Sequence, residues 1–173
     1  MSKVSSEDEI YQLKTAQRNS HRMIKMVEQL LELSRLATLR EMSMTNQNIT
    51  DIAYSTSIAF EPIATQKGIK FSTSIPADAW ANVGGDGLDK ILVNLLSNAF
   101  KYTESGGEVS FELLEDGDFW MFKVTDSGMG ISQEQQQQIF DRYHRAIDGQ
   151  NSNIFGVGIG LSLVNELIVA HKW

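Results

Sequence analysis

The chain has 173 residues, 42% of them hydrophobic, which is enough for one core with a helical appendage. Its formal net charge of −7 argues against nucleic-acid binding, which needs a basic surface, so a bound nucleotide would depend on local cations and a metal. The lack of cysteine excludes disulfides and thiolate metal sites and fits a reducing compartment. No apolar run reaches the roughly 18 residues that cross a bilayer, so any membrane anchor would lie elsewhere.

The first expected element is a long amphipathic helix over residues 13–40, a stretch without Pro or Gly. Its apolar residues recur at helical spacing: Met23, Ile24, Val27, Leu30, Leu31 and Leu36. After a polar break, a second helix is expected with Asn48 or Thr50 as its cap, running toward Gly68, with Pro62 bending it or marking a boundary.

Beyond Gly68 the pattern changes to the alternation of half-buried strands. Strands are expected over residues 69–75, 109–113 and 120–124, the last two joined by an Asp-Gly turn. Helices are expected over residues 89–103, from about 132 to 143, and from about 158 to 171. The expected fold is therefore α+β, a two-layer α/β sandwich preceded by a separate helical segment.

The helix over residues 89–103 carries the most informative pattern. Asn94, Asn98, Lys101 and Tyr102 share one face at spacings of four, three and one, opposite an apolar face. Amide oxygens can ligate a hard cation such as Mg²⁺ without adding negative charge, and a lysine can neutralise phosphates. The alternative is an ordinary amphipathic surface helix that happens to carry two asparagines.

A second pattern, Asp126-Ser127-Gly128-Met129-Gly130, follows the last expected strand. Asp126 could accept a hydrogen bond from the exocyclic amine of adenine, where guanine would present a second acceptor, and the glycines would let a flat ring approach the backbone. The alternative is a common Asp-Ser-Gly turn between a strand and a helix.

A third pattern, Gly-Val-Gly-Ile-Gly-Leu over residues 156–161, opens the last helix. Exposed backbone N–H groups and the helix N-terminus would form an anion cradle. It is neither a dinucleotide fingerprint, since Leu161 stands where that motif needs Gly or Ala, nor a Walker loop. Between the second and third patterns, Arg142 and Arg145 follow Phe140, and one of them could reach a terminal phosphate. The alternative for both arginines is a surface ion pair.

The order and spacing of these patterns resemble the ATP-binding domain of sensor histidine kinases, within the superfamily of gyrase, heat-shock chaperone and mismatch-repair ATPases. The resemblance covers roughly residues 69–171, and residues 13–41 resemble the second helix of the preceding dimerisation and phosphotransfer hairpin. It implies an ATP-binding catalytic domain over residues 46–173 and part of the dimerisation hairpin over residues 1–45. It also implies ATP and Mg²⁺ as cofactors, a homodimeric parent, and a response-regulator receiver domain as partner.

The resemblance also implies residue roles. Asn98 would ligate Mg²⁺, Lys101 would reach the phosphates, Tyr102 would lie beside the nucleotide, Asp126 would read adenine, and Arg145 would act near the terminal phosphate. The glycines of the last two patterns would form the loop hinges and the phosphate cradle: Gly128, Gly130, Gly156, Gly158 and Gly160. Leu161, next to the last of them, would also belong to the nucleotide-binding residues. Asn94 stands where hydrolysing relatives carry a glutamate that activates water, and an amide cannot act as a general base. This favours phosphoryl transfer to a protein, with Asn94, Lys101 and Arg145 as the catalytic set.

The chain departs from the family pattern at both ends. None of His21, His144 and His171 has the acidic and proline context of the family's phosphoacceptor, and the chain stops before the family's last β-hairpin. We therefore expect a fragment that binds Mg-ATP without phosphorylating itself. Alternatives are a Ser kinase of the same fold, which the long helix disfavours, and a nucleotide-binding scaffold. ATP and a reducing environment would place the domain inside the cell, and most parents of this type are membrane-tethered.

Overall fold

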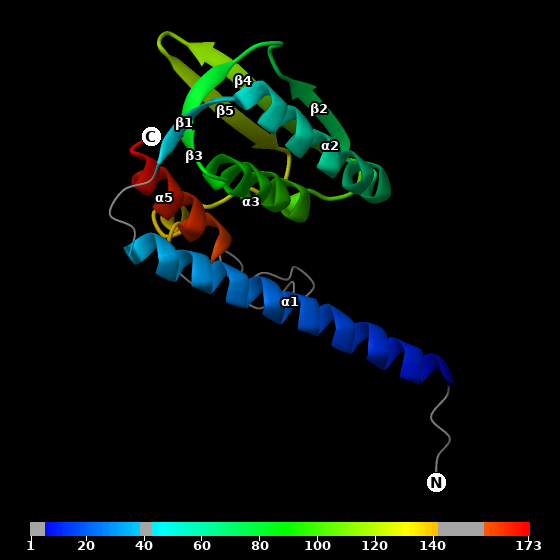
Figure 1. The fold of residues 1–173 in the computed structure, drawn as a ribbon. Coiled ribbons are helices and arrows are strands. Elements are labelled where there is room, and N and C mark those ends of the chain that lie inside the picture. The colour runs from blue at the N-terminus through cyan, green and yellow to red at the C-terminus, as the bar shows by residue number, and fades with distance from the viewer. Residues whose placement is uncertain (1–5, 39–42, 142–157) are drawn as a thin grey trace.

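A long helix, α1 (Ser6–Thr38), passes along one side of an α/β domain, and its N-terminal half extends well beyond that domain (Figure 1). The structure is a computed structural model that describes residues 6–38, 43–141 and 158–173. In the described part of the chain, no helix is both long and apolar enough to span a lipid bilayer. After α1 the described elements are, in order, β1 (Met44–Asn48), α2 (Ile49–Lys67), β2 (Lys70–Ser74), β3 (Trp80–Gly84), α3 (Gly87–Tyr102), β4 (Glu108–Asp116), β5 (Phe119–Asp126), α4 (Gln133–Gln136) and α5 (Gly160–His171).

The strands form two small sheets on which the helices are layered. The order of the larger sheet is β2-β4-β5, with β2 and β4 parallel and β4 and β5 an antiparallel hairpin. Because α3 lies between β2 and β4 in sequence, the chain can return to the start of the sheet and pair the two strands in parallel. The smaller sheet pairs β1 with β3 in antiparallel register. The expected α+β fold, with helices layered on sheet, is confirmed.

Local signals explain where α2 begins and ends. The Asn48 side-chain oxygen accepts hydrogen bonds from the backbone N–H of Thr50 at 3.0 Å and of Asp51 at 3.3 Å, so Asn48 is the N-cap. Gly68 ends the helix with a φ of 65°, a left-handed conformation that glycine adopts without steric cost. The expected boundary at Pro62 is wrong, since Pro62 lies at an exposed position inside α2 and the helix continues past it.

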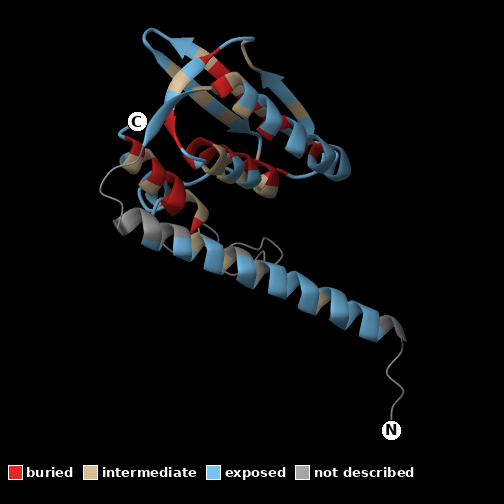
Figure 2. Cartoon of the chain, in the orientation of Figure 1, coloured by how far each residue is buried: buried red, intermediate tan, exposed pale blue. Residues whose placement is uncertain are grey.

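The main core lies between the helices α2 and α3 and the larger sheet (Figure 2). Phe100 stacks on Phe60 with ring centroids 5.4 Å apart and meets Phe71 edge-on at 5.1 Å, so it joins α3 to α2 and β2. Leu92, Leu96 and Phe111 are completely buried. This packing fixes the rotation of α3 about its axis, which decides where its polar face points.

A second apolar cluster joins α3, α5 and α1. Ile91 of α3 packs with Ile159 and with Leu163, Val164 and Leu167 of α5, while Met26 of α1 is partly buried against them. Most of α1 is exposed, as the pale blue of Figure 2 shows. The expected long helix is confirmed over the described residues. Among the α1 side chains whose burial the structure describes, Thr15, Met26 and Gln29 are partly buried and the others are exposed.

Two short helical expectations need correction. The helix that begins at the N-cap Ser132 ends at Gln136 and is followed by turns, instead of continuing toward residue 143. Neither this helix nor the two glutamines that follow it contribute a buried residue that would hold a longer helix against the domain. The last helix begins at Gly160, two residues after the expected start.

Candidate nucleotide-binding site

The polar face of α3 is the centre of the candidate site. Asn94, Asn98, Lys101 and Tyr102 are all half-buried, while the residues on the opposite side of the helix pack into the two cores. The amphipathic pattern read from the sequence therefore has the expected structural origin: apolar side chains anchor the helix, and the amides, the ammonium and the phenol stay accessible.

The N-terminal half of this face meets the start of α5. A Cβ atom placed on Gly160 would lie 2.9 Å from Asn94 Oδ1 and 4.0 Å from Asn98 Nδ2. The Asn94 amide nitrogen donates a hydrogen bond of 2.7 Å to the Lys90 carbonyl, which turns its oxygen toward Gly160. The structure thus brings Asn94, Asn98 and Gly160 together, although 62 residues separate the last two in the sequence.

The start of α5 has the features of an anion-binding terminus. Gly158 has a φ of 75°, a conformation that L side chains rarely adopt, and Ile159 occupies the N-cap position without a side-chain hydrogen bond to the first turn. The first N–H groups of a helix lack partners within the helix and carry partial positive charge. At α5 these groups belong to the turn in which Gly160 lies against Asn94 of α3.

The C-terminal end of α3 meets the segment that follows β5. A Cβ atom on Gly128 would lie 2.6 Å from the Tyr102 carbonyl oxygen and 2.7 Å from Asp126 Oδ1, so only glycine fits there without a shift. Asp126 is the last residue of β5, and its Oδ1 accepts a 2.9 Å hydrogen bond from the Gly128 N–H. The carboxylate is exposed, with one oxygen held by this bond.

Lys101 and Tyr102 interact with each other at this end of the helix. The Lys101 ammonium donates a 2.9 Å hydrogen bond to the Tyr102 hydroxyl and lies 4.5 Å from the centroid of the ring. Both side chains are half-buried, so the charge is held beside the polar face. The lysine would have to give up one neutral partner to bind a phosphate.

The remaining expected site residues are less closely tied to this face. Gly130 has a φ of 72° in the loop after β5, and Leu161 is half-buried in the first turn of α5. Arg145 and Gly156 lie outside the described residues.

His171, for which the sequence patterns predict no role in the site, is buried at the end of α5. Its ring nitrogens lie 2.6 Å from the Leu167 carbonyl oxygen and 3.1 Å from the Gly84 carbonyl oxygen. A Cβ on Gly87 would come within 2.2 Å of the ring. This contact fixes α5 against the beginning of α3, and the only sequence signal for it was a histidine on an otherwise apolar helix face.

The described part of the chain offers no cluster of three or more His, Asp or Glu for a metal ion, and Cys is absent. The chemistry of the donors on α3 nevertheless fits Mg²⁺, because amide oxygens are hard ligands and Mg²⁺ is commonly held through one or two protein ligands together with phosphate oxygens. Nearer the start of α3, burial raises the pKa of Asp89, and the neighbouring Asp86 carboxylate raises it further. Asp89 lies in the first turn of α3, before Asn94 and Asn98, and is not one of the amide donors proposed for the metal.

Residues 84–173, just over half of the chain, match the family described as Histidine kinase-, DNA gyrase B-, and HSP90-like ATPase. The chain belongs to this family. Its matched region is an ATP-binding catalytic domain of the sensor histidine kinase type, as the similar proteins indicate. This confirms the resemblance read from the sequence.

Sensor histidine kinase TmoS of Ectopseudomonas mendocina is 35% identical over 158 residues, which are 90% of this chain and 16% of TmoS. Hybrid signal transduction histidine kinase D of Dictyostelium discoideum is 32% identical over 92% of this chain and 11% of its own length. The chain therefore spans less than a fifth of either relative. Among solved structures, full-length ShkA in complex with AMPPNP has a TM-score of 0.74 at 26% identity, covering 98% of this chain and 35% of ShkA.

Proposed function

We propose that this chain is the ATP-binding catalytic portion of a two-component sensor histidine kinase. The γ-phosphoryl group of ATP would pass to a histidine of the longer parent protein and from there to an aspartate of a response-regulator receiver domain. The observation that carries the proposal is that α3 meets both Gly128 and Gly160: Tyr102 at one end contacts the segment of Asp126, and Asn94 contacts the start of α5. Asn94 and Tyr102 are separated by about 12 Å along the helix, comparable with an extended nucleoside triphosphate.

Each end of this face suits one end of ATP. The exposed Asp126 carboxylate would accept a hydrogen bond from the exocyclic amine, and the Tyr102 ring would lie beside the base. The phosphates would lie toward the first turn of α5, whose N–H groups lack partners within the helix. Lys101 would turn from the Tyr102 hydroxyl toward them. The similar structure of full-length ShkA is a complex with AMPPNP, an ATP analogue, which supports the binding of an adenine nucleotide by this fold.

Asn98 would hold Mg²⁺ through its amide oxygen, and Asn94 lies one helical turn before it on the same face of α3. The bound ion would neutralise charge on the phosphates during transfer. The chain's own contribution is positioning: the bond from Asn94 to the Lys90 carbonyl orients the amide, and the close approach of Gly160 keeps α5 against it. Asn94 cannot take a proton from water, so the site favours transfer to a protein acceptor over hydrolysis. Arg145, outside the described residues, is proposed to act near the terminal phosphate.

The experiment is calorimetric titration of the chain with ATP and GTP, with and without Mg²⁺. We expect ATP to bind more tightly than GTP by at least about tenfold, because guanine presents a carbonyl to the Asp126 carboxylate. Removing Mg²⁺ is expected to weaken ATP binding. In the same samples, γ-labelled ATP should leave no acid-labile phosphate on the chain, since the acceptor is proposed to lie in the parent. Equal affinity for the two nucleotides, or no binding of either, would contradict the proposed site.

We further propose that residues 1–45 belong to a dimerisation helix and residues 46–173 to the catalytic domain. On α1 the side chains of Ile24, Val27 and Leu31 are 53%, 53% and 64% exposed, and their spacing places them along one stripe. Because such a stripe is stabilised by packing against another helix, the chain should self-associate, and the parent should be a homodimer.

Sedimentation velocity over a range of concentrations measures this self-association. The wild-type chain is expected to sediment as a dimer or larger species at high concentration, and the double variant Val27→Gln, Leu31→Gln as a monomer. Calorimetry with ATP serves as the control: both substituted positions are exposed, and because the nearby Gln29 donates a 3.5 Å hydrogen bond to Asn94 Oδ1, an unchanged ATP affinity shows that this contact is kept. A wild-type chain that stays monomeric at every concentration would refute the proposal.

A further inference from the structure

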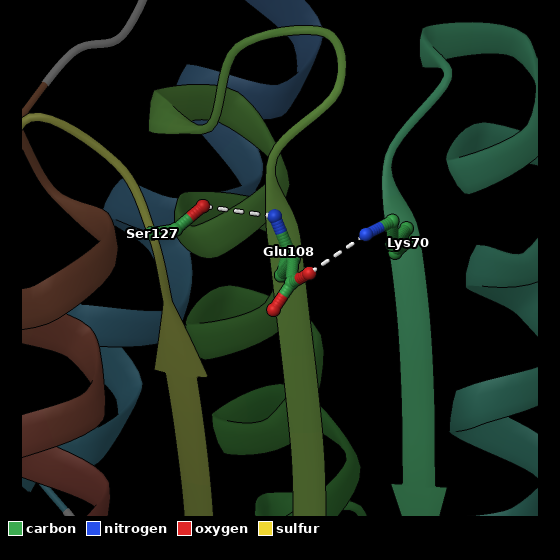
Figure 3. A network of polar contacts seen from close by, with 3 residues as sticks. All are labelled: Lys70, Glu108 and Ser127. Atoms are coloured by element: carbon green, nitrogen blue, oxygen red, sulfur yellow. Dashed lines mark hydrogen bonds and ion pairs between the residues drawn. The ribbon is translucent and has the colours of Figure 1, made fainter.

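The antiparallel pairing of β4 and β5 ends in two residues, Glu108 and Ser127, whose hydrogen bonds differ from those of a regular sheet. Continuing the register of Val109 opposite Asp126 places Glu108 opposite Ser127. In a regular hydrogen-bonded pair, each residue donates its N–H to the other's carbonyl. Here the Ser127 N–H donates to the Glu108 carbonyl at 3.0 Å, but the Glu108 N–H donates to the Ser127 hydroxyl oxygen at 2.8 Å (Figure 3). The side chain of Ser127 replaces its own carbonyl in the ladder.

This replacement lets the backbone leave the sheet without leaving an N–H group unpaired. Immediately after Ser127, Gly128 passes so close to the end of α3 that a Cβ there would lie 2.6 Å from the Tyr102 carbonyl oxygen. A serine hydroxyl can accept a backbone hydrogen bond and so compete with the regular ladder. If the Ser127 carbonyl instead accepted from Glu108, the peptide that joins Ser127 to Gly128 would be held in the regular ladder, whereas Gly128 lies against the end of α3.

Ser127 is exposed, but its hydroxyl lies close to the turn at Gly107. A Cβ on Gly107 would lie 2.8 Å from the Ser127 hydroxyl oxygen and 2.5 Å from the Thr103 methyl group, so a glycine is needed beneath it. Gly107 also donates its N–H to the Glu104 carbonyl at 3.1 Å, which ties this turn to the end of α3. The hydroxyl therefore lies between the turn at the end of α3 and the first residue of β4, whose N–H it accepts.

We infer that Ser127 is a positioning residue for base selectivity: its hydroxyl fixes the departure of the chain from β5 and thereby aims the Asp126 carboxylate at the amine of adenine. The inference rests on the proposed nucleotide site. It assigns Ser127 no contact with ATP. Its effect passes through Asp126, whose Oδ1 is bonded to the N–H of Gly128, the first residue beyond the ladder.

The Glu108 side chain provides a matched control, because it forms a separate contact at the same place. It pairs with the Lys70 ammonium at 3.0 Å, and both side chains are largely exposed (Figure 3). Ion pairs between exposed side chains contribute little to the stability of the fold. Glu108→Gln removes this ion pair and keeps the backbone N–H that donates to Ser127, so it should leave nucleotide binding unchanged.

The test compares the affinities for ATP and inosine triphosphate, which carries a carbonyl where ATP carries its amine. Ser127→Ala and Ser127→Val are expected to weaken ATP binding by roughly three- to tenfold, the size of one neutral hydrogen bond, and to leave inosine triphosphate binding unchanged. Ser127→Thr, isosteric with valine but with a hydroxyl, should restore the wild-type ratio. In an Asp126→Asn background, Ser127→Ala should not change the ratio further.

The outcomes separate this inference from the site on which it depends. If Ser127→Ala and Ser127→Val weaken both nucleotides equally, or if Ser127→Thr binds like Ser127→Val, Ser127 has no selective role and the inference is wrong. If the wild-type chain binds ATP and inosine triphosphate equally, or Asp126→Asn keeps the wild-type ratio, the proposed base contact fails and this inference fails with it. Thermal unfolding of each variant, with ATP absent, identifies any general loss of folding.

Discussion

Replacing Asp126 with asparagine is expected to weaken ATP binding by at least about a hundredfold, equivalent to about 2.7 kcal/mol. Asparagine has the same shape, and its oxygen can still accept the hydrogen bond from the Gly128 N–H, so the loop should keep its conformation. The atom presented to adenine would then be an amide nitrogen, and two N–H donors would face each other. An unpaired donor at a binding surface costs its desolvation as well as the lost bond.

Asp116→Asn is the matched control for this change. Asp116 ends β4 at the tip of the hairpin, opposite Phe119, so its substitution changes the net charge equally but far from α3. Calorimetric titration should give wild-type affinity for Asp116→Asn and a large loss for Asp126→Asn, with similar unfolding temperatures for both. A loss of less than about tenfold at Asp126 would mean that the carboxylate does not contact the base.

The parts of the fold that the sequence predicted are those set by local signals. The Asp116-Gly117 pair marks the turn of the β4–β5 hairpin, and Gly117 does adopt a left-handed φ of 62°. The strands β1 and β3 were not predicted. β1 reads Met-Thr-Asn-Gln-Asn, which has no apolar alternation, and its conformation depends on pairing with β3 from 36 residues further on.

The parallel pairing of β2 with β4 depends in the same way on the whole chain. Each strand was predicted from its own alternation, but their relative direction follows from α3 crossing between them. Local periodicity contains no information about which strand will be the neighbour. The order of the sheet therefore had to come from the structure.

The candidate site also has one part that local sequence signals predict and another that depends on contacts between distant residues. The shared face of Asn94, Asn98, Lys101 and Tyr102 follows from helical spacing alone, and the structure places all four on the accessible side of α3. The contact of His171 with the backbone of Gly84, 87 residues away, cannot be predicted from helical spacing, which shows only that a histidine lies on an apolar face. The same holds for the hydroxyl of Ser127, whose partner Glu108 is on another strand and offers only a backbone N–H.

Gly128→Ala is expected to weaken ATP binding by roughly thirty- to a hundredfold and to lower the free energy of unfolding by about 1–3 kcal/mol, the usual cost of overpacking. The added methyl would lie 2.6 Å from the Tyr102 carbonyl oxygen and 2.7 Å from Asp126 Oδ1. Because the carbonyl belongs to the backbone of α3, it cannot move aside as a side chain would. The loop has to move away from α3, and Asp126 moves with it.

Gly117→Ala separates this steric effect from backbone strain. Gly117 has a φ of 62°, and a methyl group added there would meet no atom within 4 Å, so alanine should cost only the left-handed strain, about 1–2 kcal/mol. Chemical denaturation should therefore show destabilisation in both variants, while titration with ATP should show weaker binding in Gly128→Ala alone. Wild-type affinity in Gly128→Ala would mean that the close approach of this loop to α3 is unimportant for the nucleotide, and that the base binds elsewhere on the domain.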